Sequence, residues 1–183
     1  GVGPKMIAGK TNSSNVLRRA LVQFDVSSIP ANAIITSAKI KLQMVKTSST
    51  AKMVSVHTTL ADWGEGTSND LTDGNGAPST TNDATWIHRF HTATSWINAG
   101  GDYTAMASAT LSVNAPGSYT WTSTGLAADV QNWVNGTATN NGWILIGDES
   151  TNKTTKHFAT REATVVADRP DLEVTYTVPA PAD

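Results

Sequence analysis

The sequence predicts an all-β protein: an antiparallel β-sandwich, jelly-roll-like, with one short helix. Short apolar segments alternate with polar residues at the period of two that a half-buried strand shows. Glycine, asparagine, proline and serine separate these segments, and one segment alone has helical periodicity. Because 183 residues suit one domain, we expect a single β-sandwich domain over residues 1–178 and a proline-rich linker or tail over 179–183.

The two clearest strands are expected at about 17–26 and 34–46. In the second of them, lysine or glutamine separates each apolar residue from the next, which predicts one buried and one exposed face. Two strands of this length are marginally stable alone, so further elements must cover their apolar face. We therefore expect one shared core that includes Phe24, Ile40, Leu42, Trp133 and Leu145.

Shorter strands are expected along the rest of the chain, with turn residues between them. A long stretch rich in Gly, Asn, Asp and Thr follows residue 60 and forms no regular core element. A short apolar run predicts a short edge strand at 6–8. The remaining apolar or β-branched segments predict strands at about 52–60, 85–90, 104–113, 119–122, 143–146, 155–162 and 172–178.

Residues 123–136 predict the helix. Ser123 or Thr124 can cap its N-terminus, its apolar residues recur on one face, and Gly136 suits its C-terminal end. Tryptophans in regular elements with apolar neighbours are expected in the core: Trp121, Trp133 and Trp143.

Composition excludes several classes of protein. A net charge of −2 gives no electrostatic case for nucleic acid, and no apolar run is long enough for a membrane span. The absence of cysteine excludes disulfides and thiolate metal sites. We therefore expect no nucleic-acid partner and no membrane insertion. With 15% charged residues and abundant threonine, the chain suits exposed β-structure better than a helical cytosolic enzyme.

Four ordered blocks resemble a known family. They are RALVQFDVSSIP followed by ITSAKIKLQM, then DWGEG at 62–66, DVQNWVNGTATNNGWILIGDE at 129–149, and FATRE…RPDLEVTY at 158–176. This order resembles the DNRLRE-type domain, also known as the disaggregatase-related or family-96-like carbohydrate-binding module. The resemblance implies an extracellular or cell-surface β-sandwich, in some relatives one that binds acidic polysaccharide.

The resemblance also implies a strand that this sequence lacks. Family members carry a strand and an Asn-Tyr-Gly turn before the position of Gly3, whereas this sequence begins inside that turn. We therefore expect the sheet edge near residues 1–26 to be open and completed from outside this sequence. An upstream segment or a strand from a neighbouring copy could fill it.

No catalytic constellation is present in the sequence, since it has neither a GxSxG nor an HExxH motif, so we expect no enzymatic activity. Rings in and beside the long loop could instead stack on sugar faces, while cations pair with uronate carboxylates. For the loop tryptophans, a role as a core plug is an equally weighted alternative. The candidate ligand-binding residues are Trp63, Trp86, His88, Arg89, Trp96 and Tyr103.

Carboxylates in the glycine-rich loops suggest calcium as a cofactor, because they offer hard, flexible oxygen ligands. The candidate metal ligands are Asp62, Glu65 and Asp102, with Asp70 and Asp73 as further acidic residues nearby. Paired turns are the alternative explanation of this acidic stretch.

A structural charge network is expected around the ATRE block. Arg161 and Glu162 would point to opposite faces of a strand and so need separate partners, with Asp25 as the partner of Arg161. The leading functional hypothesis is a non-catalytic extracellular module that binds acidic polysaccharide, with a structural calcium as an addition. The alternative is a structural subunit or adhesin module of a cell-surface filament, in which copies partner each other by strand donation.

Overall fold

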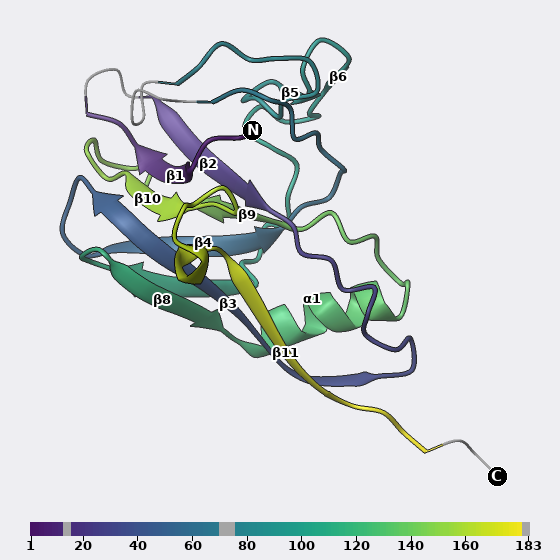
Figure 1. Cartoon of the computed structure of the whole chain (residues 1–183). Coiled ribbons are helices and arrows are strands. Elements are labelled where there is room, and N and C mark those ends of the chain that lie inside the picture. Colours follow the sequence, from purple (N-terminus) through teal and green to yellow (C-terminus); the bar gives the residue numbers. More distant parts are fainter. Residues whose placement is uncertain (13–15, 70–75, 181–183) are drawn as a thin grey trace.

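A computed structural model describes residues 1–12, 16–69 and 76–180, and it is all-β and antiparallel (Figure 1). The strands curl into a sandwich, and one α-helix packs on it, as the sequence predicts. The elements are β1 (Lys5–Lys10), β2 (Leu17–Val22), β3 (Ile34–Thr47), β4 (Lys52–Thr58), β5 (His88–Phe90), β6 (Thr94–Ser95), β7 (Ala109–Val113), β8 (Gly117–Thr122), α1 (Thr124–Val134), β9 (Trp143–Ile146), β10 (Lys156–Ala159), a 3₁₀ turn η1 (Val166–Asp168) and β11 (Asp171–Thr177).

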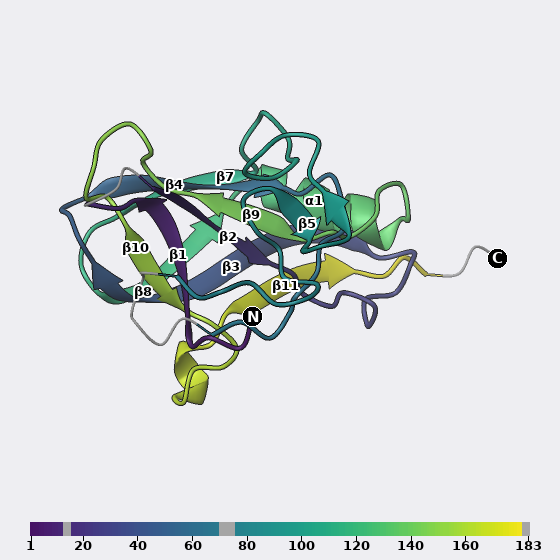
Figure 2. The same ribbon diagram turned by 90° about the horizontal axis from the view of Figure 1, so that it is seen from above.

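The strands follow the order β11-β3-β10-β1-β2-β9-β4-β7, and β8 pairs with β3. The long strand β3 holds three partners: β8 on one edge, and β11 and β10 end to end on the other. In the view from above, β4, β7 and β9 form one layer and β3, β8 and β11 the other (Figure 2). The strands β1 and β2 join the two layers at one side.

The core lies between these layers. The apolar residues on one face of β3 are fully buried, which confirms the alternation read from the sequence: Ala38, Ile40, Leu42 and Met44. The helix α1 adds Leu126, Val130 and Trp133, and its N-terminus is capped by Ser123, whose Oγ accepts a hydrogen bond from the Leu126 N–H at 3.0 Å. Leu145, Trp121 and Trp143 are buried in the same core, as expected.

Phe24 departs from the expected core. It is half-buried and packs edge-on against Trp143 with ring centroids 6.3 Å apart. The physical reason is that β2 ends at Val22 rather than near residue 26, so Phe24 lies beyond the ladder at the margin of the sandwich.

Two expected strands are shorter than predicted because loop contacts replace ladders. The segment 104–113 becomes a strand only from Ala109, since the Thr104 and Ser108 N–H groups bond irregularly to β4. The segment 155–162 keeps β10 as far as Ala159 and then turns, which places Arg161 and Glu162 outside the strand.

Candidate functional site

The strands β1 and β2 form a fork. Their ladder joins two residue pairs, Gly9 with Arg18 and Lys10 with Leu17. Away from this short ladder, residues 5–8 of β1 pair with β10 and residues 19–22 of β2 pair with β9. The two strands therefore diverge into different layers. Gly9 has a φ of +117°, and a Cβ there would lie 2.8 Å from the Thr154 carbonyl oxygen. The branch point therefore requires glycine.

On β1, Ile7 faces the gap of this fork. The Thr160 N–H donates to the Pro4 carbonyl at 3.1 Å, and the Thr154 N–H donates to the Lys10 carbonyl at 2.9 Å. Because backbone groups alternate in direction along a strand, the even-numbered residues of β1 bond to β10. Ile7 therefore directs its N–H and C=O toward β2, where no described residue pairs with it.

On β2, Leu21 faces the same gap. The Thr59 N–H donates to the Gly142 carbonyl at 3.0 Å, so the even-numbered residues of β9 bond to β4. Leu21 lies opposite Ile144, whose backbone groups are thus engaged with β4. Leu21 consequently directs its N–H and C=O away from β9. Within the described residues, no ladder satisfies these groups on either side of the gap.

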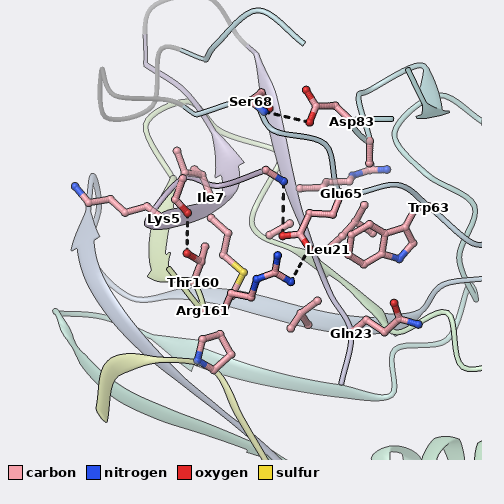
Figure 3. A pocket seen from close by; sticks show the side chains of 18 of the residues that line it. Lys5, Ile7, Leu21, Gln23, Trp63, Glu65, Ser68, Asp83, Thr160 and Arg161 are labelled. Atoms are coloured by element: carbon pink, nitrogen blue, oxygen red, sulfur yellow. Dashed lines mark hydrogen bonds and ion pairs between the residues drawn. The ribbon is translucent and has the colours of Figure 1, made fainter. Parts of the chain in front are cut away.

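A cleft of about 450 Å³ occupies the gap (Figure 3). Ile7 and Leu21 line opposite sides of it, and the loop that carries Trp63 adjoins it. The Glu65 carboxylate lies 3.7 Å from the Gly1 amino group and 2.7 Å from Nη1 of Arg161, which ties the loop to the residues before β1 and to the turn after β10. Hydrogen bonding to Glu162, with the charge of Glu65, raises the pKa of Arg161.

A second hollow of about 350 Å³ lies along β11. It shares Phe24 and Pro170 with the walls of the first, so the two follow one another. Among the described residues β11 pairs with β3 alone, which leaves its outer edge open. The facing wall is the irregular segment 24–29. The half-buried apolar residues here are Phe24, Val26, Ile29, Leu172 and Val174. We call the two hollows together the seam.

The structure places the open edge differently from the sequence analysis. The expected open edge at residues 1–26 is wrong in its position, because both β1 and β2 have neighbours on two sides. Their mutual ladder is nevertheless only two residue pairs long, and the open strand edge is that of β11. The gap is therefore internal to the sandwich rather than at the rim of a sheet.

The candidate sugar-binding residues do not form one open platform. Trp86 is 38% exposed, Trp96 is buried with its Nε1–H donating to the Thr85 carbonyl, and Trp63 lines the cleft while donating to the Asn141 carbonyl. Trp96 therefore fits the core-plug alternative. Tyr103 packs edge-on against His57, and His88 against His91. Arg89 is paired with Asp62.

Arg19 is a residue that the sequence analysis missed. Its guanidinium lies 4.8 Å from the Trp86 ring centroid and 5.3 Å from that of Tyr103. It donates two hydrogen bonds to Glu149, at 2.7 and 2.8 Å, and one to the Gly100 carbonyl at 3.0 Å. The strand β2 thereby holds the long loop. The two adjacent arginines at 18 and 19 are visible in the sequence, but the residues that Arg19 contacts are distant from it in the sequence.

The three candidate calcium ligands lie in different contacts. Asp62 pairs with Arg89, Glu65 with Arg161, and Asp102 accepts the N–H groups of Ile97 and Asn98 at 2.8 Å each. Burial raises the pKa of Asp102, but these hydrogen bonds outweigh it and leave the pKa below its ordinary value. The described residues contain no group of three acidic, histidine or cysteine side chains that could hold a metal ion. Asp70 and Asp73 lie outside the described residues, and calcium stays a prediction.

The expected charge network has different partners. Arg161 and Glu162 do contact each other, with Nε 3.0 Å from Oε1, because they lie in a turn rather than on opposite faces of a strand. Asp25 does not pair with Arg161. Its carboxylate instead accepts the Ser27 N–H at 2.8 Å, and this local turn lowers its pKa.

Comparison with known proteins returned no assignment: no family model matches the chain, and no curated protein matches it. Across residues 1–12, 16–69 and 76–180, no helix is long and apolar enough to cross a membrane.

Proposed function

We propose that this protein is a non-catalytic structural module of a cell-surface assembly, and that its seam accepts an extended β-strand from another chain. The observation that carries the proposal is the open border of the seam. Within the described residues, no ladder pairs the backbone groups that Ile7 and Leu21 direct into the cleft, and β11 has a free outer edge.

An inserted strand supplies what this border lacks. Unpaired backbone groups shielded from water cost free energy, and free strand edges are templates for a further strand. Binding by strand addition uses main-chain hydrogen bonds for affinity and side-chain pockets for specificity. The half-buried state of Phe24, Leu172 and Val174 supports the same occupant, because a strand there would complete their burial.

The test compares two charged substitutions at exposed positions. Tyr176→Arg places a cation in the β11 hollow, where Tyr176 is 39% exposed. Met53→Arg places the same group on β4, outside the seam, where Met53 is 53% exposed. We expect sedimentation velocity to show assemblies for the wild type and for Met53→Arg, and monomers for Tyr176→Arg, whose melting temperature should equal that of the wild type at a dilution where it does not assemble.

A wild type that stays monomeric at all concentrations and whose Ile7 and Leu21 amides exchange freely with solvent would refute the proposal. Equal assembly by all three proteins would refute the role of the seam. Hydrogen exchange of the two amides reads the occupancy of the cleft directly, since an inserted strand protects them.

A second candidate function is binding of acidic polysaccharide. It is supported by the exposed face of Trp86 and by Trp63, Lys5 and Arg161 in one cleft, which combine rings with cations. Trp86→Ala and Trp63→Ala should then reduce retention in affinity electrophoresis through gels containing alginate or pectate. Failure of the wild type to be retarded by either polymer excludes this candidate for those sugars.

A further inference from the structure

The chain leaves the body of the sandwich after β11. Residues 178–180 are exposed and extend away from all other elements, starting beside the end of the seam that Tyr176 lines (Figures 1 and 2). The sequence from Val178 to Asp183 reads VPAPAD. Two prolines at alternate positions favour an extended conformation, so little conformational entropy would be lost on docking.

We propose that this segment, in a second copy of the chain, is the strand that occupies the β11 part of the seam. The inference rests on the function proposed above and names the donor. When extended, residues 178–183 cover about 20 Å, which is enough to pair along most of the seven-residue strand β11.

The proline pattern fits a hollow that offers strand pairing on one side only. Along β11 the donor meets a free strand edge, but its other side meets residues 24–29, which carry no ladder. That segment is closed by local turns, with the Ser27 N–H on the Asp25 carboxylate and the Ile29 N–H on the Val26 carbonyl. A strand there needs N–H groups at every second residue.

The sequence after Thr177 provides this arrangement. Val178 and Ala180 keep their N–H groups and can pair with β11, while Pro179 and Pro181 fall on the side without a ladder. Proline is tolerated in strands where its missing N–H faces no partner. Alanine and proline are also small enough for a hollow of about 350 Å³.

The donor must come from another copy because the tail cannot fold back onto its own strand. A return along β11 needs a tight hairpin directly after Thr177, and such turns require residues that adopt positive φ, mainly glycine or asparagine. The sequence VPAP has neither. Donation from copy to copy is a head-to-tail contact, which produces a fibre when its rotation does not close.

Disulfide trapping tests the donor, and the absence of native cysteine makes it selective. One full-length variant carries Ala180→Cys and is mixed with a second variant that carries Ser28→Cys, in the wall of the β11 hollow. The matched control partner carries Ser112→Cys, an exposed serine on β7 away from the seam. We expect a disulfide-linked dimer with Ser28→Cys and none with Ser112→Cys.

The outcomes separate the donor from the acceptor. If the wild type assembles and Tyr176→Arg does not, but the Ser28→Cys mixture gives no linked dimer, the tail is not the donor, although the β11 hollow still accepts a strand. A disulfide formed only within a single chain carrying both Ala180→Cys and Ser28→Cys would refute donation from a second copy. Equal linkage to Ser28→Cys and Ser112→Cys would show random collision and overturn the inference.

Discussion

At the scale of single residues, Lys156 is the most unusual side chain of the fold. It is fully buried, and its ammonium donates to Thr47 Oγ1 at 2.7 Å and to the Ser49 and Thr50 carbonyls at 3.1 and 2.7 Å. Burial, with a smaller effect from Lys52, lowers its pKa. The lysine thereby ties β10 to the turn between β3 and β4.

Replacing Lys156 by methionine should destabilise the protein, because a similar volume is kept while three acceptors lose their donor. The residues that accept these hydrogen bonds are half-buried or exposed, so we expect a loss of about 1–3 kcal/mol in denaturant unfolding, the size of hydrogen bonding from a charged donor. Lys41→Met on the exposed face of β3 is the control and should change stability by less than about 0.5 kcal/mol. Equal midpoints for the two variants would contradict this role.

Asp148 should make stability depend on acid. Its hydrogen bond with Lys52 at 2.7 Å, assisted by Ser150, lowers its pKa well below the ordinary 3.8. A lowered folded-state pKa means that the unfolded chain binds a proton first as the pH falls, so the stabilisation is complete above about pH 5 and declines progressively from about pH 4 toward the lowered folded-state pKa. In melts from pH 6 to pH 2.5, Asp148→Asn should lose less stability than the wild type. Asp171→Asn should follow the wild type.

Phe24 should respond less than a full core residue. Because it is half-buried at the seam, Phe24→Ala should cost about 1–2 kcal/mol in the isolated chain, below the 3–5 kcal/mol of a fully buried phenylalanine. The buried Leu145→Ala serves as the comparison, at about 2–5 kcal/mol. A larger loss for Phe24→Ala than for Leu145→Ala in chemical unfolding would place Phe24 in the core after all.

At the scale of elements, the long loop depends on its attachment to β2 through Arg19. Lysine can neither stack as a flat group between Trp86 and Tyr103 nor bind Glu149 with two parallel hydrogen bonds. Arg19→Lys should therefore release the loop, with faster hydrogen exchange at the Gly100 amide while the Leu42 amide stays protected. Arg18→Lys, one residue earlier, is the matched control. Unchanged exchange at Gly100 would show that the loop is held by other contacts.

The sequence predicted elements well where local alternation decides the structure. The lysines at 39 and 41 mark the exposed face of β3, and Ser123 marks the start of α1. It predicted boundaries less well where distant partners decide them. The strand β2 ends at Val22 because β9 supplies no further residues opposite it, and nothing near Phe24 in the sequence reports this.

The candidate site was predictable only in outline. The resemblance implied a missing strand near the N-terminus, and the structure has a gap there, but the position of that gap follows from registers. The divergence of β1 and β2 depends on which layer each strand joins, and the open edge of β11 depends on β10 sharing β3 with it. The contacts of Arg19 and the burial of Lys156 were not predictable either, because their partners lie more than 60 positions away in the sequence.

At the scale of the whole molecule, stability and assembly should be coupled. A strand that binds the folded seam and not the unfolded chain stabilises the fold by mass action, by about 2.7 kcal/mol when the donor is at a hundred times its dissociation constant. The melting temperature of the wild type should therefore rise with protein concentration in calorimetry. Tyr176→Arg, which places a charge in the hollow beside β11, should melt at one temperature throughout. If the melting temperature rises with concentration in both proteins, the copies associate elsewhere. If the wild type sediments as polymers but its melting temperature stays constant, assembly leaves the seam empty.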